Sequence, residues 1–325
     1  MTKKIAIIGS GPAGLSCANK LVSNGFSVTV FDELSEFGGM LAYGIPEFRI
    51  PLKNVHTQIN VAKKNGIIFE NKKIDTIHEL INKNNETSDK KFDLVVIAIG
   101  AGTGIKAGFE NENSSNVIDA LDFLLNDKLN NKKMMNGGDI VGIIGGGNSA
   151  IDAARVAKKQ GALPKIIYRR TENEMPALKK EVSDAKKDLV EFEFLLAPKK
   201  LVLAKSDLNN NKCKLICSVM ELGEMDSSGR RKPIESKKVK EFDLDKIIIA
   251  VGQQNNFEWL EKDGVKTNGK IILIDEHYLT SLKNVYACGD AVTGAKTIGE
   301  AVLTGIKCAE NIILSTNKLD WIKRV

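Results

Sequence analysis

Two glycine-rich turns, each directly behind a run of apolar residues, constrain this chain of 325 residues more than any other feature. The first turn is Gly9-Ser10-Gly11-Pro12-Ala13-Gly14, and the second is Gly145-Gly146-Gly147-Asn148-Ser149-Ala150. In each, the pattern predicts a buried strand that runs through a tight turn into a helix, whose first amide groups face the turn. Such a cluster of amides binds the pyrophosphate of a dinucleotide. Two of them in one chain predict two dinucleotides held face to face, the arrangement in which a flavin receives a hydride.

The residues after each turn decide between a dinucleotide site and an ordinary glycine-rich surface turn. After the first turn come a helical stretch over 15–21, a break at Asn24-Gly25 and a strand over 28–31 that ends in Asp32-Glu33. This spacing is close to the roughly twenty residues at which an acid meets a ribose hydroxyl. The second turn is followed by a helix over 150–159 and a strand over 165–168 that ends in Arg169-Arg170. Both turns therefore have the complete context of a dinucleotide site.

The different endings of the two second strands assign the two cofactors. An acid suits a free ribose diol, whereas arginine at the same place suits a 2′-phosphate through charge-assisted hydrogen bonds. The first site is therefore predicted to bind FAD and the second NADPH. The alternative for Arg169 and Arg170 is an ordinary solvated pair at a strand end. Ala150 in place of a third glycine is tolerated where a helix packs closely on a strand.

The order of the elements predicts one domain inserted into another. Two strands that end in glycine, 94–100 and 247–252, bracket the insertion, which contains the second turn. The predicted fold class is α/β, with two Rossmann-like three-layer domains and the NADPH domain inserted into the FAD domain. The expected boundaries are 1–103 and 250–325 for the FAD domain and 104–249 for the NADPH domain. Short apolar runs over 190–247 predict an antiparallel meander, and a helix over about 297–315 is expected to close the FAD domain.

Composition excludes several classes of protein. With 42% hydrophobic residues the chain can bury two ordinary cores, and it contains no apolar run near the length of a membrane span. The predicted first strand follows Met1 at once, so we expect a cytoplasmic protein without a signal peptide. The net charge of +6 is spread out, which argues against nucleic acid. It would favour an acidic partner protein, although a Lys- and Asn-rich genome would also produce it. Five scattered cysteines without a C-x-x-C pair argue against a metal site, an iron–sulfur cluster or a redox dithiol.

A second dense motif, Tyr286-Ala287-Cys288-Gly289-Asp290-Ala291-Val292, follows the insertion. A strand that ends in Gly289-Asp290 places a carboxylate where it can accept a hydroxyl proton from the ribityl chain of a flavin. The last helix is expected to begin near Thr297, with its first amides facing the flavin ring atoms where negative charge develops on reduction. A plain Gly-Asp turn is the alternative. Cys288 is expected to lie near the flavin as a buried small hydrophobic residue.

Three longer motifs, in this order, resemble the glutamate synthase small (beta) subunit, and the flavin half of dihydropyrimidine dehydrogenase is similar too. They are Gly38-Gly39-Met40-Leu41-Ala42-Tyr43-Gly44-Ile45-Pro46-Glu47-Phe48-Arg49-Ile50-Pro51, Tyr168-Arg169-Arg170-Thr171-Glu172-Asn173-Glu174-Met175-Pro176 and Met220-Glu221-Leu222-Gly223-Glu224. The resemblance implies FAD contacts from Gly9, Gly11, Pro12, Ala13, Gly14, Asp32, Glu33, Gly39, Met40, Arg49, Ile74, Gly100, Gly289, Asp290, Thr297 and Ile298. It implies NADPH contacts from Gly145, Gly147, Asn148, Ser149, Ala150, Arg169, Arg170, Ala250, Val251 and Gly252. For Arg49 the alternative is a solvated loop arginine.

The resemblance also implies a reaction. NADPH passes a hydride to FAD, no side-chain acid, nucleophile or metal is needed for that step, and electrons leave to an iron–sulfur protein or a larger synthase-type subunit. Two departures from the family matter: its N-terminal iron–sulfur domain is not expected here, and Ala42 stands where many members have arginine. The alternatives are a ferredoxin–NADP reductase of the adrenodoxin-reductase type, a cofactor-binding subunit active only within a complex, and a cofactor-free scaffold.

Overall fold

The computed structural model describes residues 2–81, 92–203, 212–226 and 229–322, and its contacts divide the chain into two compact units. The first unit consists of Met1–Tyr43, Glu47–Thr103 and Gln253–Val325, and the second of Gly44–Pro46 and Gly104–Gly252. Short strands β5 (Thr103–Gly104) and β14 (Gln253–Gln254) pair with each other where the chain passes between the units. The second unit is therefore almost wholly an insertion into the first.

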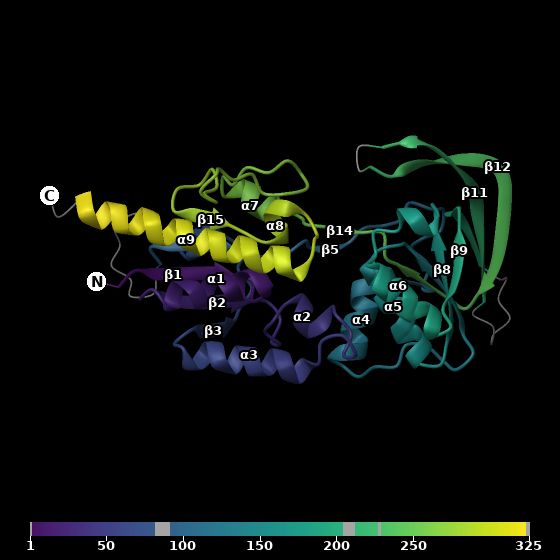
Figure 1. Cartoon of the computed structure of the whole chain (residues 1–325), viewed down its shortest axis with the longest axis horizontal. Coiled ribbons are helices and arrows are strands. Elements are labelled where there is room, and N and C mark those ends of the chain that lie inside the picture. Colours follow the sequence, from purple (N-terminus) through teal and green to yellow (C-terminus); the bar gives the residue numbers. More distant parts are fainter. Residues whose placement is uncertain (1, 82–91, 204–211, 227–228, 323–325) are drawn as a thin grey trace. The chain divides into compact units, whose positions relative to one another are not determined.

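The first unit is built on a parallel sheet of five strands in the order β15-β4-β1-β2-β3 (Figure 1). The strands are β1 (Lys4–Ile8), β2 (Ser27–Asp32), β3 (Ile68–Asn71), β4 (Leu94–Ile97) and β15 (Val285–Ala287). The helices are α1 (Pro12–Val22), α2 (Met40–Tyr43), α3 (Leu52–Lys64), α7 (Glu258–Lys262), α8 (Asp290–Thr293), α9 (Ile298–Ile322) and the short 3₁₀ helix η1 (Ile77–Glu79). The central strands β1 and β4 are near-continuous apolar runs because both faces of a parallel sheet are covered.

The core of the first unit is closed by the last helix of the chain. Figure 1 shows α9 lying alongside α1, and the two approach closely because Gly305 has no side chain. A Cβ atom at Gly305 would lie 2.2 Å from the carbonyl oxygen of Ala13. The hydroxyl of Ser16 on α1 also donates to the carbonyl of Val302 on α9 at 3.1 Å. The predicted closing helix is confirmed, but it continues to Ile322 rather than ending near 315, since no glycine or proline interrupts 306–322.

The second unit contains a parallel sheet of five strands in the order β6-β13-β7-β8-β9 and an antiparallel sheet in the order β10-β11-β12. The parallel strands are β6 (Val117–Asp119), β7 (Ile140–Ile144), β8 (Leu163–Tyr168), β9 (Glu191–Phe194) and β13 (Lys246–Ile249). The antiparallel strands are β10 (Leu196–Leu203), β11 (Cys213–Met225) and β12 (Arg231–Leu244). The helices are α4 (Ala120–Lys128), α5 (Asn148–Lys159), α6 (Lys179–Lys187) and the 3₁₀ helix η2 (Glu172–Glu174).

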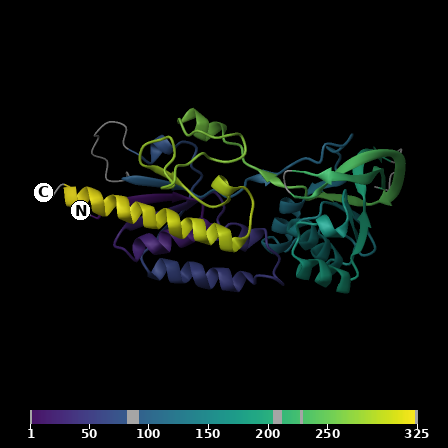
Figure 2. The same cartoon turned by 45° about the horizontal axis from the view of Figure 1, so that its top comes forward.

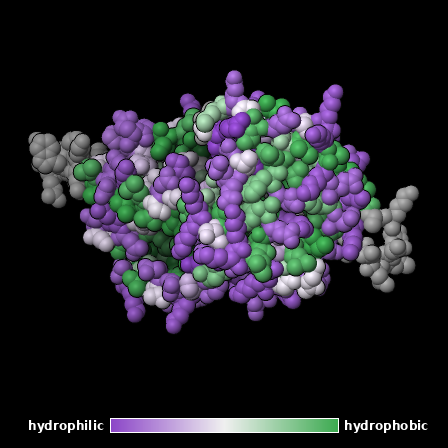
Figure 3. Space-filling model, turned by 45° about the vertical axis from the view of Figure 1, so that its right-hand side comes forward, coloured by the Kyte–Doolittle hydropathy of each residue, from purple (hydrophilic) through white to green (hydrophobic). Residues whose placement is uncertain are grey.

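The expected meander over 190–247 is right in kind but wrong in extent. Residues 191–194 form β9, which pairs in parallel with β8, and 246–249 form β13 in the middle of the parallel sheet. The antiparallel part is limited to β10–β12, whose inner face packs on Ile144, Ile167 and Ile249. Figure 2 shows β11 and β12 as a long hairpin. The two parallel sheets confirm the predicted α/β fold class, and Figure 3 shows polar side chains scattered among apolar ones on the face in view.

Candidate dinucleotide-binding sites

The first glycine turn is shaped by its contact with Ala98, the residue that follows strand β4. Gly9 has φ +105°, and a Cβ atom there would lie 2.3 Å from the carbonyl oxygen of Ala98. A Cβ at Gly14 would lie 2.0 Å from the carbonyl oxygen of Gly9. At Gly11, by contrast, no heavy atom lies within 4 Å of the added Cβ. Glycine is thus required by packing at 9 and 14, whereas at 11 it leaves open space, the arrangement that a bound pyrophosphate needs.

Helix α1 presents its start to this open space. Gly11 is the N-cap, Pro12 takes the first helical position, and the cap has no side-chain hydrogen bond among the described residues. Proline is suited to that position because its missing N–H has no helical partner to lose. Uncapped amides together with the positive end of the helix dipole make an anion-binding site. The local geometry therefore fits the pyrophosphate of a dinucleotide.

Asp32 is held beside the turn by a residue that the sequence reasoning missed. Its Oδ2 accepts hydrogen bonds from the backbone N–H of Ser10 at 2.8 Å and from the Ser10 hydroxyl at 2.6 Å. The same hydroxyl oxygen accepts from the N–H of Gly38 at 2.9 Å. A Cβ at Gly39 would lie 2.8 Å from the Cα of Gly11, so this segment rests on the turn. Ser10 thereby joins three of the predicted FAD motifs, a role that its place between two glycines does not reveal.

One carboxylate oxygen of Asp290 is left without a partner in the described part of the first unit. Its Oδ1 is buried and has no hydrogen-bond partner among the described residues, and burial raises the pKa of its carboxyl group. Gly289, with φ +73°, packs on α1, because a Cβ there would lie 2.7 Å from that of Ala13. An orphaned buried acceptor can take a hydrogen bond from a bound ligand or from water. The hydroxyl of a ribityl chain, the predicted partner, can supply that hydrogen bond.

The start of α9 is less open than expected. The hydroxyl of Thr297 donates to Glu300 Oε2 at 2.9 Å, and the Thr297 N–H donates to the same oxygen at 3.2 Å. These hydrogen bonds lower the pKa of Glu300. The first amide of the helix start is therefore taken by a carboxylate of the chain itself. Ile298 follows with 36% of its surface exposed.

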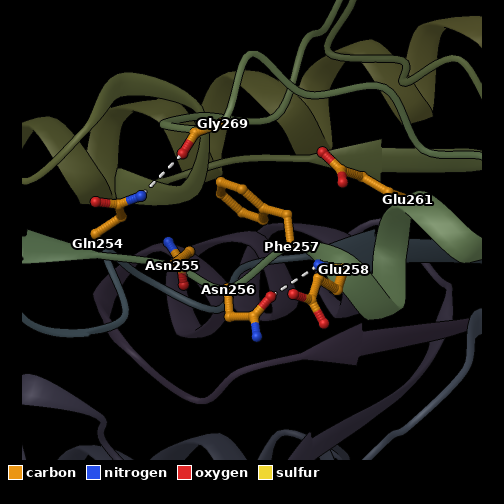
Figure 4. Close-up of a pocket in the computed structure, with 7 residues that line it drawn as sticks. All are labelled: Gln254, Asn255, Asn256, Phe257, Glu258, Glu261 and Gly269. Atoms are coloured by element: carbon orange, nitrogen blue, oxygen red, sulfur yellow. Dashed lines mark hydrogen bonds between the residues drawn. The ribbon is translucent and has the colours of Figure 1, made fainter.

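The other predicted FAD residues have varied surroundings. Gly100 has φ +74° and open space for a Cβ, and its carbonyl oxygen accepts from Asn255 Nδ2 at 2.8 Å. Asn255 was not predicted; it lines a shallow pocket with Gln254, Asn256, Phe257, Glu258, Glu261 and Gly269 (Figure 4). Ile74 is 5% exposed and its side chain packs in the core, so that only its backbone can contact a ligand. Met40 and Arg49 are half-buried and Glu33 is exposed. Their contacts with FAD remain predictions.

The second glycine turn repeats the construction of the first. Gly145 has φ +144°, and its added Cβ would lie 2.2 Å from the carbonyl oxygen of Ala250, the counterpart of Ala98. Gly147 has nothing within 4 Å of its added Cβ, like Gly11, and is the N-cap of α5. Ala150, in the third-glycine position, is fully buried. The same physical device thus appears twice in the chain.

A segment that follows β8 is fastened to the second turn. The N–H of Leu178 donates to Asn148 Oδ1 at 3.0 Å, and the N–H of Ala177 donates to the carbonyl of Gly146 at 3.2 Å. Ser149 is half-buried beside Asn148. Beyond β13, Ala250 is half-buried, and Val251 and Gly252 are exposed. Strands β7 and β13 are parallel neighbours, so the predicted NADPH residues at 145–150 and 250–252 lie together at the carboxyl-end edge of the parallel sheet of the second unit.

The two arginines after β8 differ sharply. Arg169 is exposed, whereas Arg170 is 4% exposed. Arg170 Nε donates to the carbonyl of Arg231 at 2.6 Å, and Arg170 Nη2 lies 2.6 Å from Asp226 Oδ2. The alternative of an ordinary solvated arginine is therefore wrong for Arg170, because its side chain is buried in an ion pair.

Three of the five cysteines come together, which corrects the view that they are scattered. Cys17, Cys288 and Cys308 are fully buried in one core cluster of the first unit. Burial raises the pKa of the Cys308 thiol well above its usual value, so that thiol is un-ionised at neutral pH. The prediction that Cys288 is a buried small residue is confirmed. No group of His, Cys, Asp and Glu side chains suited to a metal ion occurs within the described ranges, and no helix there is long and apolar enough to span a membrane.

Comparison with known proteins gives the family. Residues 3–305 match the model for pyridine nucleotide-disulphide oxidoreductases. The chain is 36% identical over 316 residues to the beta subunit of the NADP(+)-dependent formate dehydrogenase of Moorella thermoacetica, covering 95% of this chain and 43% of that protein. It is 34% identical over 333 residues to the Escherichia coli glutamate synthase [NADPH] small chain, covering 96% and 68%. The chain thus spans less than half of the first relative and about two thirds of the second.

Solved structures confirm the fold. Mycobacterium tuberculosis FprA in complex with NADPH is 18% identical, with a TM-score of 0.78 over 98% of this chain and 86% of that one. The thioredoxin reductase of T. acidophilum is 22% identical, with a TM-score of 0.72 over 97% and 99%. The predicted resemblance to the glutamate synthase small subunit is confirmed by sequence identity, and the two-domain dinucleotide-binding fold by structure. The chain belongs to the pyridine nucleotide-disulphide oxidoreductase family and is related to the glutamate synthase small chain.

Proposed function

We propose that this protein oxidises NADPH through a bound FAD and passes the electrons to a separate partner protein. The observation that carries the proposal is the pair of turns built alike, in which Gly11 and Gly147 both leave open space at an uncapped helix start. Each fits one dinucleotide pyrophosphate. The two turns belong to different units of one chain, so each unit has a site of its own for one dinucleotide.

In this proposal the first turn holds FAD. The amides of α1 bind its pyrophosphate, Asp32 faces the ribose, and the orphaned Oδ1 of Asp290 accepts a ribityl hydroxyl. The segment at Gly39, Met40 and Arg49 and the residues Glu33, Ile74, Gly100, Thr297 and Ile298 complete the predicted contacts. FAD, when bound, supplies the capacity to accept a hydride and release its electrons. The protein positions the cofactor and shields it, and no side-chain acid or nucleophile is assigned to this half-reaction.

The second turn would hold NADPH. Its pyrophosphate faces Gly145, Gly147 and the start of α5, with Asn148 and Ser149 beside it. The arginine pair stands at the end of β8, where a 2′-phosphate binds in this fold, and of the two Arg169 is exposed to an incoming ligand. The names of the two relatives, an NADP(+)-dependent subunit and an NADPH-dependent chain, support the choice of NADPH over NADH.

The partner is proposed to be an iron–sulfur protein or a larger synthase-type subunit. Relatives such as the NADPH-Fe(3+) oxidoreductase subunit beta of Geobacter sulfurreducens are named as subunits of larger proteins. The net charge of +6 would attract an acidic partner. We also propose a cytoplasmic location, which suits a protein whose described cysteines are free thiols.

The test uses the purified chain alone. It is expected to be yellow, to release FAD on heating, and to oxidise NADPH in the presence of an artificial dye acceptor. Release of FMN, or a colourless protein that cannot be reconstituted with FAD, would contradict the flavin assignment. Bound FAD without dye reduction by NADPH would indicate a subunit active only within a complex.

A further inference from the structure

The adjacent arginines at the end of β8 are placed for two different tasks. Arg169 is exposed, and its charge faces solvent. The side chain of Arg170 is 5% exposed and is bound twice by the β11–β12 hairpin, through the carbonyl of Arg231 and the carboxylate of Asp226. Both contacts are 2.6 Å, so they are short hydrogen bonds, and both are charge-assisted because the donor is a guanidinium group. Arg170 therefore ties the hairpin to the strand that ends at the proposed NADPH site.

The hairpin needs such a tie. Strand β10 pairs with β11 only as far as Val219, so beyond that point residues 220–225 and 231–235 pair as a two-stranded ribbon. An isolated ribbon of two strands is marginally stable in water. Two of its apolar residues are largely exposed, Met225 at 72% and Ile234 at 52%, whereas Met220 is buried. Asp226 shapes the end of the ribbon, because its N–H donates to the carbonyl of Arg230 at 2.8 Å while its carboxylate binds Arg170.

A phosphate that took Arg170 would have to break these contacts. The Asp226 carboxylate, 27% exposed, would lose its ion pair with Arg170, and the Arg231 carbonyl would lose the Arg170 hydrogen bond. Such losses at buried groups are unfavourable. Arg169 can bind an incoming phosphate without any such loss. The free energy of binding is therefore more favourable when the phosphate binds Arg169 than when it binds Arg170.

We propose that Arg169 carries the discrimination for a 2′-phosphate, and that Arg170 is a positioning residue that clamps the β11–β12 hairpin beside the adenosine end of the site. This division rests on the proposed binding of NADPH to the second unit. It predicts that the two arginines, although adjacent, give different results when each is removed.

The test compares two ligands that contain only the adenosine end: 2′,5′-ADP, which has the 2′-phosphate, and 5′-AMP, which lacks it. Their affinities for the full chain are measured by calorimetry. Arg169→Ala is expected to lower the affinity for 2′,5′-ADP by about ten- to a hundred-fold and to change the affinity for 5′-AMP by less than about twofold. Hydrogen exchange over 220–226 and 229–235 is expected to stay at the wild-type rate.

The clamp is tested with the double variant Arg170→Ala/Asp226→Ala, which leaves the net charge unchanged. It is expected to speed hydrogen exchange in the hairpin and to preserve the ratio of the two affinities within about twofold. Asp226→Asn, which keeps the side-chain shape, is expected to give a smaller effect of the same kind. Arg155→Ala is the matched control, because Arg155 pairs with Glu181 and Asp188 elsewhere in the same unit.

The outcomes separate the two proposals. If the double variant loses the preference for 2′,5′-ADP while its hairpin exchanges at the wild-type rate, Arg170 is a phosphate ligand and the clamp is wrong. An increased preference in Asp226→Asn would also overturn it, because Asp226 would then compete with the phosphate. If the wild-type chain binds both ligands equally, the NADPH assignment itself fails.

Discussion

The space around each glycine of the first turn predicts opposite results for two alanine substitutions. Gly9→Ala adds a Cβ that would lie 2.3 Å from the Ala98 carbonyl oxygen, where real Cβ atoms stay beyond 3.0 Å. It also forces alanine to adopt φ +105°. The unfavourable backbone conformation costs about 1–3 kcal/mol and the overpacking about as much again. We expect the unfolding free energy of the apoprotein to fall by about 2–6 kcal/mol.

Gly11→Ala should leave the fold intact. Gly11 has φ −68° and ψ −178°, which alanine adopts readily, and its added Cβ meets no atom within 4 Å. The stability should stay the same or rise by about 0.4–1 kcal/mol, because alanine has less freedom in the unfolded chain. The methyl group, however, occupies the space assigned to the pyrophosphate. The loss of even two charge-assisted hydrogen bonds costs about 3 kcal/mol or more, which weakens the binding of FAD by at least about a hundred-fold.

The assay measures both quantities on the same samples. Urea unfolding of the apoproteins, followed by circular dichroism, gives the stabilities, and quenching of flavin fluorescence gives the affinity for FAD. Normal FAD binding by Gly11→Ala would refute the assignment of the open space at Gly11 to the pyrophosphate. Wild-type stability of Gly9→Ala would refute the packing argument at Gly9. Gly147→Ala provides the matched case, because its fold and FAD binding should be normal while NADPH binding is lost.

Four further predictions follow from the charges and burial described above. Arg169→Ala should raise the Michaelis constant for NADPH far more than that for NADH; an equal effect on both would contradict the 2′-phosphate role. Asp290→Asn should stabilise the apoprotein at neutral pH, because burial raises the folded-state pKa of Asp290 and its ionised form is penalised. The gain measured by urea unfolding should vanish as pH falls below the unfolded pKa of about 3.9, and a gain that persists there would contradict this cause. If charge guides docking, reduction of the natural acceptor should slow steeply between low and physiological salt while dye reduction changes little; a salt-independent rate would exclude it. The native protein should react with thiol reagents at none of its five buried cysteines, and the unfolded protein at all of them; a fast-reacting native thiol would show that the core opens.

The sequence predicted the fold because the fold depends on local patterns that occur twice. An apolar strand, a glycine turn and a helix leave little choice of structure, and the endings in Asp32 and Arg169-Arg170 are visible as letters. What it missed depends on contacts between distant segments. Nothing near Ser10 reveals that its hydroxyl joins Asp32 to Gly38, and nothing near Asn255 reveals that it binds the carbonyl of Gly100.

The arginine pair shows the same limit more sharply. Two adjacent arginines look equivalent in the sequence, and only the hairpin that begins more than forty residues later makes one buried and the other exposed. Likewise, the strand pattern over 190–247 did not distinguish antiparallel β10–β12 from β9 and β13, which join the parallel sheet. Alternating short apolar runs specify strands but not the partner beside which each strand lies.

The divided first unit has a consequence for how the protein is made. Its opening strands and α1 leave the ribosome early, but β15, which pairs with β4, and α9, which covers α1, follow only after the intervening Gly104–Gly252. At about 5–20 residues per second, the roughly 300 residues from α1 to the end of α9 take about fifteen to sixty seconds, and the apolar face of α1 waits that long for its cover. The inserted unit is nearly continuous in sequence and can complete its own core during that interval. The first unit therefore completes its core after the inserted unit, although β1 and β2 are synthesised before that unit, and until then α1 is the surface that lacks its cover.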